Sequence, residues 1–232
     1  MHTFAVSVII PAYNEEETIG DIISTTTQIM ENMNLPYEII VVDDGSTDKT
    51  AMIASLYKVT VLSNGQNQGK GYSLRRGFRQ AQGDIIVTID SDGEHHPKEI
   101  PDLVNPLLNG ADVVSGSRFM GENDQVTSKI NQIGNMLLNT AIMSLTGKRI
   151  TDTQTGFRAI KKEVLEKLNL ESDGYDIETE IIVKSLRNGF VFKELPITCE
   201  RRKYSLSKLN ILTDGLRIFK MVVKSSFSQI DH

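Results

Sequence analysis

Polar and acidic residues follow three short hydrophobic runs in the first half of the chain, each at the point where the run ends. The segments are 11–15 (Pro-Ala-Tyr-Asn-Glu), 43–46 (Asp-Asp-Gly-Ser) and 90–94 (Asp-Ser-Asp-Gly-Glu). The runs are rich in Val and Ile, which is typical of β-strands. Because ligands bind beyond the carboxyl ends of the strands in an open parallel sheet, we expect the three segments to face one crevice.

The third segment carries the residues that could hold a metal ion. Side chains two apart on an extended segment project to one side, so Asp90, Asp92 and Glu94 could share a ligand. Carboxylates gathered in one crevice repel each other unless a cation or hydrogen-bond donors compensate. Mg²⁺ and Mn²⁺ favour carboxylates together with substrate phosphates. An exposed acidic turn is the alternative, but the position directly after a hydrophobic strand favours the metal site.

The other two segments could bind a nucleotide. A carboxylate at the end of the second run can accept hydrogen bonds from a base or a ribose, and Asp43 is the candidate. Helix capping is the alternative for Asp44 and Ser46, and the two roles can hold for different residues. Tyr13 is interpreted either as an aromatic wall for a base or as a partly buried turn residue.

Basic residues in three places could neutralise phosphate groups. Lys70 lies at the start of a predicted helix, where backbone amides bind anions, although a plain loop is the alternative. Arg118 follows a predicted strand, and a cluster that contains Arg202 and Lys208 follows the last one. An Arg fork matches phosphate oxygens in bidentate fashion, so the cluster could clamp a diphosphate, with a solvated surface as the other interpretation.

Composition narrows the class of protein. The 232 residues are 39% hydrophobic and 24% charged, as in soluble globular proteins, and the net charge of -5 argues against a nucleic-acid partner. The single cysteine, Cys199, cannot form an internal disulfide. We expect no signal peptide and no transmembrane helix, so a protein that works on membranes would lie on the surface or bind a spanning partner.

Strand and helix patterns alternate along the chain. Strands are predicted at 6–10, 38–42, 58–62, 85–89, 112–115 and 190–197. Helices are predicted at 15–33, 47–57, 70–82, 97–109, 128–146, 161–168, 175–188 and 208–224. The alternation predicts an α/β fold with a mostly parallel central sheet flanked by helices. One domain, 1–232, is the simplest interpretation, with a Rossmann-like first half (1–120) and a specialised C-terminal half (121–232).

Seven segments together resemble family-2 glycosyltransferases of the GT-A fold. They occur in the family's order at 8–15, 41–47, 67–71, 89–93, 116–118, 152–158 and 202–208. The segment Asp-Thr-Gln-Thr-Gly-Phe-Arg is the one most particular to the polyprenyl-phosphate branch, which includes dolichol-phosphate mannose synthases and dolichyl-phosphate β-glucosyltransferases. The likeness spans almost the whole chain and implies a nucleotide-sugar donor, such as GDP-mannose or UDP-glucose.

The resemblance also implies a role for each candidate residue. The base and ribose would be held by Pro11, Tyr13, Glu15 and Asp43, with Asp44 and Lys70 also at the donor. Asp90 and Asp92 would carry Mg²⁺ or Mn²⁺ at the diphosphate, and Glu94 stands where relatives often have Gln. Arg202 and Lys208 would hold phosphates, although Ser205 replaces a glycine that relatives often have between them. Arg118 would face the acceptor phosphate, with Asp152 near the transfer site.

The implied reaction is a single inverting displacement at the anomeric carbon. The acceptor is a phosphate monoester, largely ionised at neutral pH, so positioning and charge neutralisation matter more than a strong base. Asp152 is interpreted either as a base or as an orienting residue.

The implied acceptor, a polyprenyl phosphate, is membrane-bound. The resemblance thus implies a nucleotide-sugar-binding half (1–120) and an acceptor-binding, interfacial half (121–232). Segments 128–146 and 208–224 could therefore be interfacial helices. The protein would then be cytoplasmic and attached peripherally to the cytoplasmic face of a membrane, or it would bind a separate membrane subunit. Core packing or a dimer face is the alternative, so a homo-oligomer stays open.

Other functions remain open at this point. One is a family-2 transferase that acts on a glycan or a small hydroxyl acceptor. Another is a non-catalytic sugar-nucleotide-binding subunit, against which the Asp90 and Asp92 pair argues. A phospho-acceptor signalling domain would leave the third acidic segment unexplained. The residue types leave the identity of the sugar and of the base undetermined.

Overall fold

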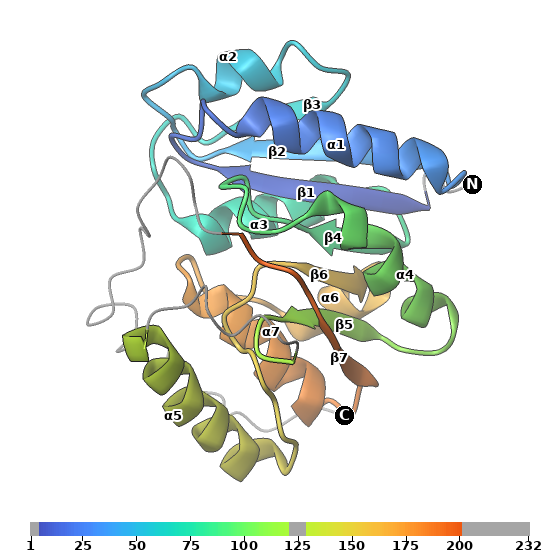
Figure 1. The fold of residues 1–232 in the computed structure, drawn as a ribbon, viewed down its shortest axis with the longest axis vertical. Helices are drawn as coiled ribbons and strands as arrows, with labels where there is room; N and C mark the ends of the chain where they lie inside the picture. Colours follow the sequence, from blue (N-terminus) through green and yellow to red (C-terminus); the bar gives the residue numbers. More distant parts are fainter. Residues whose placement is uncertain (1–4, 121–128, 201–232) are drawn as a thin grey trace.

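The computed structural model describes residues 5–120 and 129–200, which form one seven-stranded sheet with helices on both faces (Figure 1). The predicted helix 208–224 and the cluster with Arg202 and Lys208 lie outside the described residues. The strands are β1 (Val6–Ala12), β2 (Tyr37–Asp43), β3 (Thr60–Ser63), β4 (Ile85–Thr88), β5 (Val113–Ser117), β6 (Arg158–Lys161) and β7 (Phe192–Pro196). The helices are α1 (Ile19–Asn32), α2 (Thr50–Ala54), α3 (Lys70–Gln80), the 3₁₀-helix η1 (Pro97–Glu99), α4 (Ile100–Leu108), α5 (Lys129–Thr146), α6 (Lys162–Leu168) and α7 (Asp176–Arg187).

The strand order is β3-β2-β1-β4-β6-β5-β7, and the neighbouring pairs are parallel except those that involve β6. The predicted α/β fold with a mostly parallel sheet is therefore confirmed. The sequence patterns do not predict β6, which lies antiparallel between β4 and β5. Its four residues begin with Arg158 and end with Lys161, so no hydrophobic run marks it.

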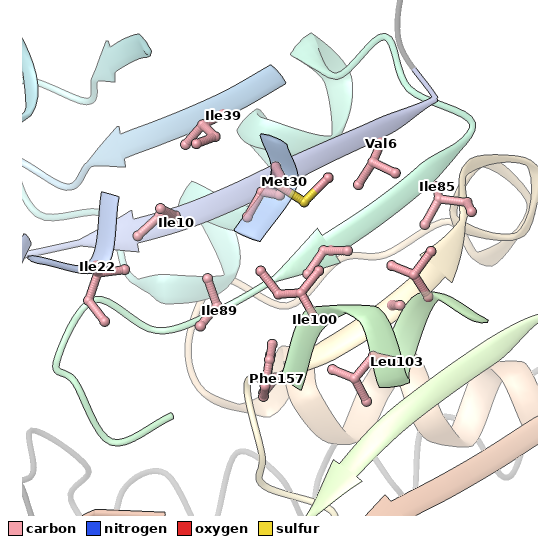
Figure 2. Close-up of a cluster of buried hydrophobic side chains, with 14 of the residues drawn as sticks. Val6, Ile10, Ile22, Met30, Ile39, Ile85, Ile89, Ile100, Leu103 and Phe157 are labelled. Carbon is pink, nitrogen blue, oxygen red and sulfur yellow. The ribbon is translucent and has the colours of Figure 1, made fainter. Parts of the chain in front are cut away.

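Both faces of the sheet are buried, which explains why the central strands are hydrophobic throughout. Side chains alternate along β1: Val8 packs with α1 and α4 on one face, whereas Ile9 packs with α3, α6 and α7 on the other. Figure 2 shows the first of these clusters, in which Ile22 of α1 and Ile100 of α4 lie over the sheet. The paired helix layers fix the carboxyl ends of β1, β2 and β4 at one edge.

The predicted helices 15–33 and 47–57 begin three or four residues later in the structure, and both differences lie at the carboxyl ends of these strands. Residues 15–18 are a loop rather than the first turn of α1. The predicted helix 47–57 is reduced to α2, and Ser46 is not its N-cap, because the Ser46 hydroxyl accepts a hydrogen bond from the Asn14 backbone N–H at 3.0 Å instead. Residues that the sequence patterns assign to helices therefore form loops next to the strand ends, and hydrogen bonds connect these loops to each other.

Helix α5 lies at one end of the molecule beside α7 (Figure 1). Its buried residue Ile142 packs with Ile182 and Val183 of α7, whereas Met136 and Met143 are exposed. Across the described ranges, none of the helices combines the length and apolar character needed to span a membrane.

Candidate active site

A cleft of about 410 Å³ opens at the carboxyl ends of β1, β2 and β4, where the sequence predicts a shared crevice. All three polar segments contribute to it. Its lining consists of Pro11, Ala12, Tyr13, Glu15, Asp44, Asn67, Gly69, Lys70, Ser73, Asp90, Ser91, Asp92 and Tyr175. Of the predicted donor and metal residues that the structure describes, only Asp43 and Glu94 are absent from this lining.

The first loop is held in place by the second. Asn14 adopts a left-handed backbone conformation (φ 53°), which Asn tolerates better than most residues. Its side-chain oxygen accepts a hydrogen bond from the Thr47 N–H at 2.8 Å, and the Glu15 N–H donates to the Thr50 hydroxyl at 2.8 Å. The wall that carries Tyr13 and Glu15 is therefore tied to the chain after β2.

Asp44, rather than Asp43, is the carboxylate of the second loop at the cleft. Both carboxylates are buried, but only Asp44 contributes to the cleft lining; Asp43 accepts hydrogen bonds from the Ser46 N–H at 3.2 Å and the Ser63 hydroxyl at 3.3 Å. Asp44 accepts hydrogen bonds from the backbone N–H groups of Gln68 (2.9 Å) and Gly69 (2.8 Å). Asp44 thus fixes the loop that leads into α3 and presents Lys70.

The third loop is anchored under the first. The Ser91 hydroxyl donates to the Pro11 carbonyl at 2.9 Å, and the Thr18 hydroxyl donates to the Ser91 carbonyl at 2.6 Å. Asp92 accepts a hydrogen bond from the Glu94 N–H at 2.9 Å. These contacts hold Asp92 at the cleft wall.

Lys70 pairs with two carboxylates, one of which is at the cleft. Its ammonium lies 2.6 Å from Asp90 Oδ1 and 2.8 Å from Glu178 Oε1. Burial alone would lower the pKa of Lys70, but the two carboxylates more than offset it and the pKa is raised. The ammonium therefore stays charged. Gly156 packs against this pair, since a Cβ there would lie 2.5 Å from Asp90 Oδ2 and 2.6 Å from Lys70 Nζ.

A second charged cluster lies beyond the acidic loop and outside the cleft lining. Arg118 Nε is 2.7 Å from Asp152 Oδ2, and Arg118 Nη1 is 3.3 Å from Glu94 Oε1. Glu194 of β7 accepts hydrogen bonds from the backbone N–H groups of Thr151 and Asp152. Burial alone would raise the pKa of Asp152, but the adjacent guanidinium more than offsets it and lowers that pKa. Arg118 and Asp152 are therefore a fixed pair.

The arrangement fits a divalent cation held partly by a ligand. Asp90 and Asp92 both line the cleft, and Mg²⁺ is commonly bound by one or two carboxylates plus substrate phosphates. Glu94, the third predicted ligand, points to Arg118 instead. Within residues 5–120 and 129–200 no group of three or more His, Cys, Asp or Glu side chains could hold a metal alone. A cation here would depend on the diphosphate for its remaining ligands.

Two residues at the site are not singled out by the sequence patterns. Tyr175 lines the cleft, and its ring centroid lies 5.7 Å from Lys70 Nζ. Glu178 is buried on α7 beneath Lys70. In the sequence, both residues lie at the start of the predicted helix 175–188. An acidic residue in the first turn of a helix is usually explained by the helix dipole, so Glu178 does not stand out as a site residue.

A mostly parallel sheet whose strand-end loops carry paired carboxylates around one cleft is the arrangement of GT-A glycosyltransferases, which take sugar from nucleotide donors. Residues 7–169 match the model of glycosyl transferase family 2. The chain therefore belongs to this family and is a glycosyltransferase.

Similar proteins extend the match over most of the chain. An uncharacterized protein of Methanocaldococcus jannaschii is 36% identical over 232 residues, which cover 95% of this chain and 92% of that protein. Dolichol-phosphate mannosyltransferase of Pyrococcus furiosus is 35% identical over 88% of this chain and 59% of its own length. An undecaprenyl-phosphate 4-deoxy-4-formamido-L-arabinose transferase of Serratia proteamaculans is 34% identical over 90% and 66%. The chain thus spans less than two thirds of the two named transferases.

A solved structure supports the fold. Glucosyl-3-phosphoglycerate synthase of Mycobacterium tuberculosis, crystallised with Mn²⁺, UDP and phosphoglyceric acid, superposes with a TM-score of 0.77 at 25% identity. The superposition covers 98% of this chain and 80% of that one. The GT-A fold inferred from the strand order and the cleft is therefore the fold of a structurally characterised glycosyltransferase.

Proposed function

We propose that the protein transfers a hexose from a nucleotide sugar to a polyprenyl phosphate, with inversion and with the help of a divalent cation. The observation that carries the proposal is the cleft in which Tyr13, Asp90 and Asp92 meet, because it joins a wall for a base to a carboxylate pair. The relatives named as polyprenyl-phosphate sugar transferases support the choice of acceptor.

The donor would lie across the three loops. Pro11, Tyr13 and Glu15 would hold the base and ribose, with Asp44 taking the place at the cleft that the sequence assigns to Asp43. Lys70 would lie beside the diphosphate, at the start of α3, with its ammonium held by Asp90 and Glu178. Asp90 and Asp92 would hold Mg²⁺ or Mn²⁺, which stabilises negative charge on the leaving diphosphate. Arg202 and Lys208 keep their predicted roles.

The acceptor phosphate would bind next to Arg118. Its guanidinium is fixed by Asp152, and fixed donors stabilise anions without reorganisation. We assign Asp152 an orienting role, because a buried carboxylate with a lowered pKa is a poor acceptor for a proton at neutral pH. An ionised phosphate monoester needs no strong base, so this assignment agrees with the proposed acceptor.

The exposed apolar residues of α5 would contact the membrane that contains the acceptor. Met136, Met143 and Leu145 are all exposed on this helix. Exposed apolar residues on a helix can lie in the interfacial layer of a bilayer. We therefore place the protein peripherally on the cytoplasmic face of a membrane, or beside a spanning partner, with a second copy of the chain as the alternative cover for α5.

A donor screen tests the proposal. GDP-mannose, UDP-glucose and other nucleotide hexoses are supplied with a short polyprenyl phosphate, with and without chelator. We expect transfer from one donor, loss with chelator and recovery with Mg²⁺ or Mn²⁺. Asp92→Asn should lower turnover by about 10²-fold or more, because it removes charge from the cation site. Chelator-insensitive transfer would exclude the cation, and inert lipid phosphate would exclude the acceptor.

A second candidate is transfer to a small phosphorylated acceptor. The structural neighbour with a TM-score of 0.77 was crystallised with phosphoglyceric acid, which presents a hydroxyl group beside a phosphate. Including phosphoglyceric acid in the same screen separates the two acceptors.

A further inference from the structure

Lys70 is shared between a carboxylate at the cleft and a carboxylate behind it. The Asp90 side chain, at 2.6 Å from the ammonium, is 19% exposed, whereas the Glu178 side chain, at 2.8 Å, is only 2% exposed. The ammonium therefore has one partner that a ligand can reach and one that belongs to the interior.

Glu178 is itself fixed by Arg158 of β6. Arg158 Nη1 lies 2.9 Å from Glu178 Oε2 and donates to the Glu178 backbone carbonyl at 2.8 Å, and Nη2 donates to the Thr155 carbonyl at 2.7 Å. Arg158 is fully buried. The charges alternate from the cleft inward along Asp90, Lys70, Glu178 and Arg158. Arg158 therefore gives Glu178 an anchor that does not depend on Lys70.

A divalent cation bound at Asp90 would change the balance around Lys70. The cation and the ammonium would then lie next to the same carboxylate, and like charges repel strongly in a poorly solvated site. The Lys70 ammonium cannot move away from the cation in the direction of Gly156, because the Gly156 backbone already packs against it. If the ammonium moves toward Glu178 instead, it stays paired with a carboxylate.

We propose, on the basis of the function proposed above, that Lys70 is the resident counter-cation of Asp90 in the ligand-free cleft. In this proposal Glu178 is the positioning residue that retains the Lys70 ammonium when a divalent cation binds. Lys70 and the cation then compete for Asp90, and Glu178 weakens the hold of Lys70 on that carboxylate. Arg158 keeps Glu178 oriented for this task.

The proposal predicts opposite changes in cation affinity for two isosteric variants. Lys70→Met removes the competitor, so the protein without nucleotide should bind Mn²⁺ more tightly than wild type, by about tenfold. Glu178→Gln leaves Lys70 with Asp90 as its one remaining ion-pair partner among residues 5–120 and 129–200, so Mn²⁺ should bind about tenfold more weakly in the presence of UDP or GDP. In the Lys70→Met background, Glu178→Gln should change Mn²⁺ affinity by less than about threefold.

Mn²⁺ binding is measured by the loss of the electron paramagnetic resonance signal of aqueous Mn²⁺, without sugar or lipid. Asp112→Asn is the matched control, since it removes one carboxylate from a pair with Lys161 (2.8 Å) outside the cleft lining, and it should leave Mn²⁺ affinity unchanged. Thermal unfolding shows that each variant is folded.

Equal Mn²⁺ affinity in wild type and folded Glu178→Gln would overturn the proposal, as would an equal loss in the Lys70→Met background. If Glu178→Gln does not fold, Lys70→Met decides alone: no gain in Mn²⁺ affinity overturns the proposal. Because no acceptor is present, failure of sugar transfer to polyprenyl phosphate would leave these binding results standing and would count only against the proposed function.

Discussion

Asp152 accepts hydrogen bonds from Arg118 with both carboxylate oxygens, from Nε at 2.7 Å and from Nη2 at 3.0 Å. Asp152 is fully buried, whereas the Arg118 side chain keeps 16% of its surface exposed. The pair therefore presents a guanidinium whose orientation is set from the interior.

Asp152→Asn should destabilise the protein mainly at neutral pH. Removing one partner of a buried ion pair costs about 3–5 kcal/mol of unfolding free energy. Because the pKa of Asp152 is lowered, its contribution is present above the ordinary carboxyl pKa and is lost as the pH falls through the lowered value. The gap between wild type and variant should thus shrink from pH 7 to pH 3 in urea unfolding.

Asp112→Asn provides the comparison for that experiment. Asp112 also pairs with a cation, Lys161, but its side chain is 21% exposed, so we expect a cost below about 1 kcal/mol. A gap for Asp152→Asn that stays constant down to pH 3 would contradict the lowered pKa.

Gly156→Ala should impair the donor site more than the fold. The added Cβ would lie 2.5 Å from Asp90 Oδ2 and 2.6 Å from Lys70 Nζ, so one of the two charged groups must move. We expect nucleotide binding with Mn²⁺, measured by calorimetry, to weaken about tenfold, because small displacements of positioned groups have large effects. An unchanged affinity would show that the cleft can absorb the methyl group.

Cys199 should be unreactive in the folded protein. Burial and the nearby Glu94 carboxylate raise the pKa of its thiol to about 12, and the thiolate is the nucleophile. At pH 8 we expect alkylation by iodoacetamide to be at least about a hundredfold slower than in urea. Cys199 is the only cysteine in the chain, so the measured alkylation rate reports on this residue alone. Similar rates in both states would contradict the raised pKa.

Polar substitutions on α5 should weaken membrane association. Met136→Gln with Met143→Gln removes two exposed apolar side chains, so binding to vesicles that contain polyprenyl phosphate should fall several-fold in a sedimentation assay. Leu108→Gln on α4 is the control, since Leu108 is 62% exposed, like Met136 at 60%. Equal losses for both variants would argue against a specific role of α5.

The location of the polar strand-end residues was predictable from the sequence because hydrophobic runs mark the central strands and the polar residues follow them directly. Asp90, Asp92 and Tyr13 were placed correctly in one cleft for this reason. The direction of a side chain after the last strand residue was not predictable, which is why Asp44 rather than Asp43 reaches the cleft. Such differences depend on the turn that each loop makes.

Buried charges were the harder part to predict. Arg158 and Glu178 look like surface residues in the sequence, since isolated Arg and Glu are rarely buried without a partner. Their burial can be recognised only in the folded structure, where β6 packs against α7 and each residue supplies the countercharge of the other. For the same reason β6 is not recognisable as a buried strand in the sequence, because its first residue is Arg158.

The position of β6 binds the two halves of the sequence into one hydrogen-bonded ladder. A strand from beyond residue 120 separates β4 from β5, both of which precede it in the chain. A fragment that stops at residue 120 would keep the pairing of β4 with β1 but lose β6, and β5 would lose both of its partners, so the exposed edges of β4 and β5 would be sites for misassociation. We therefore expect the chain before and after residue 120 to unfold in one cooperative step rather than as two independent domains.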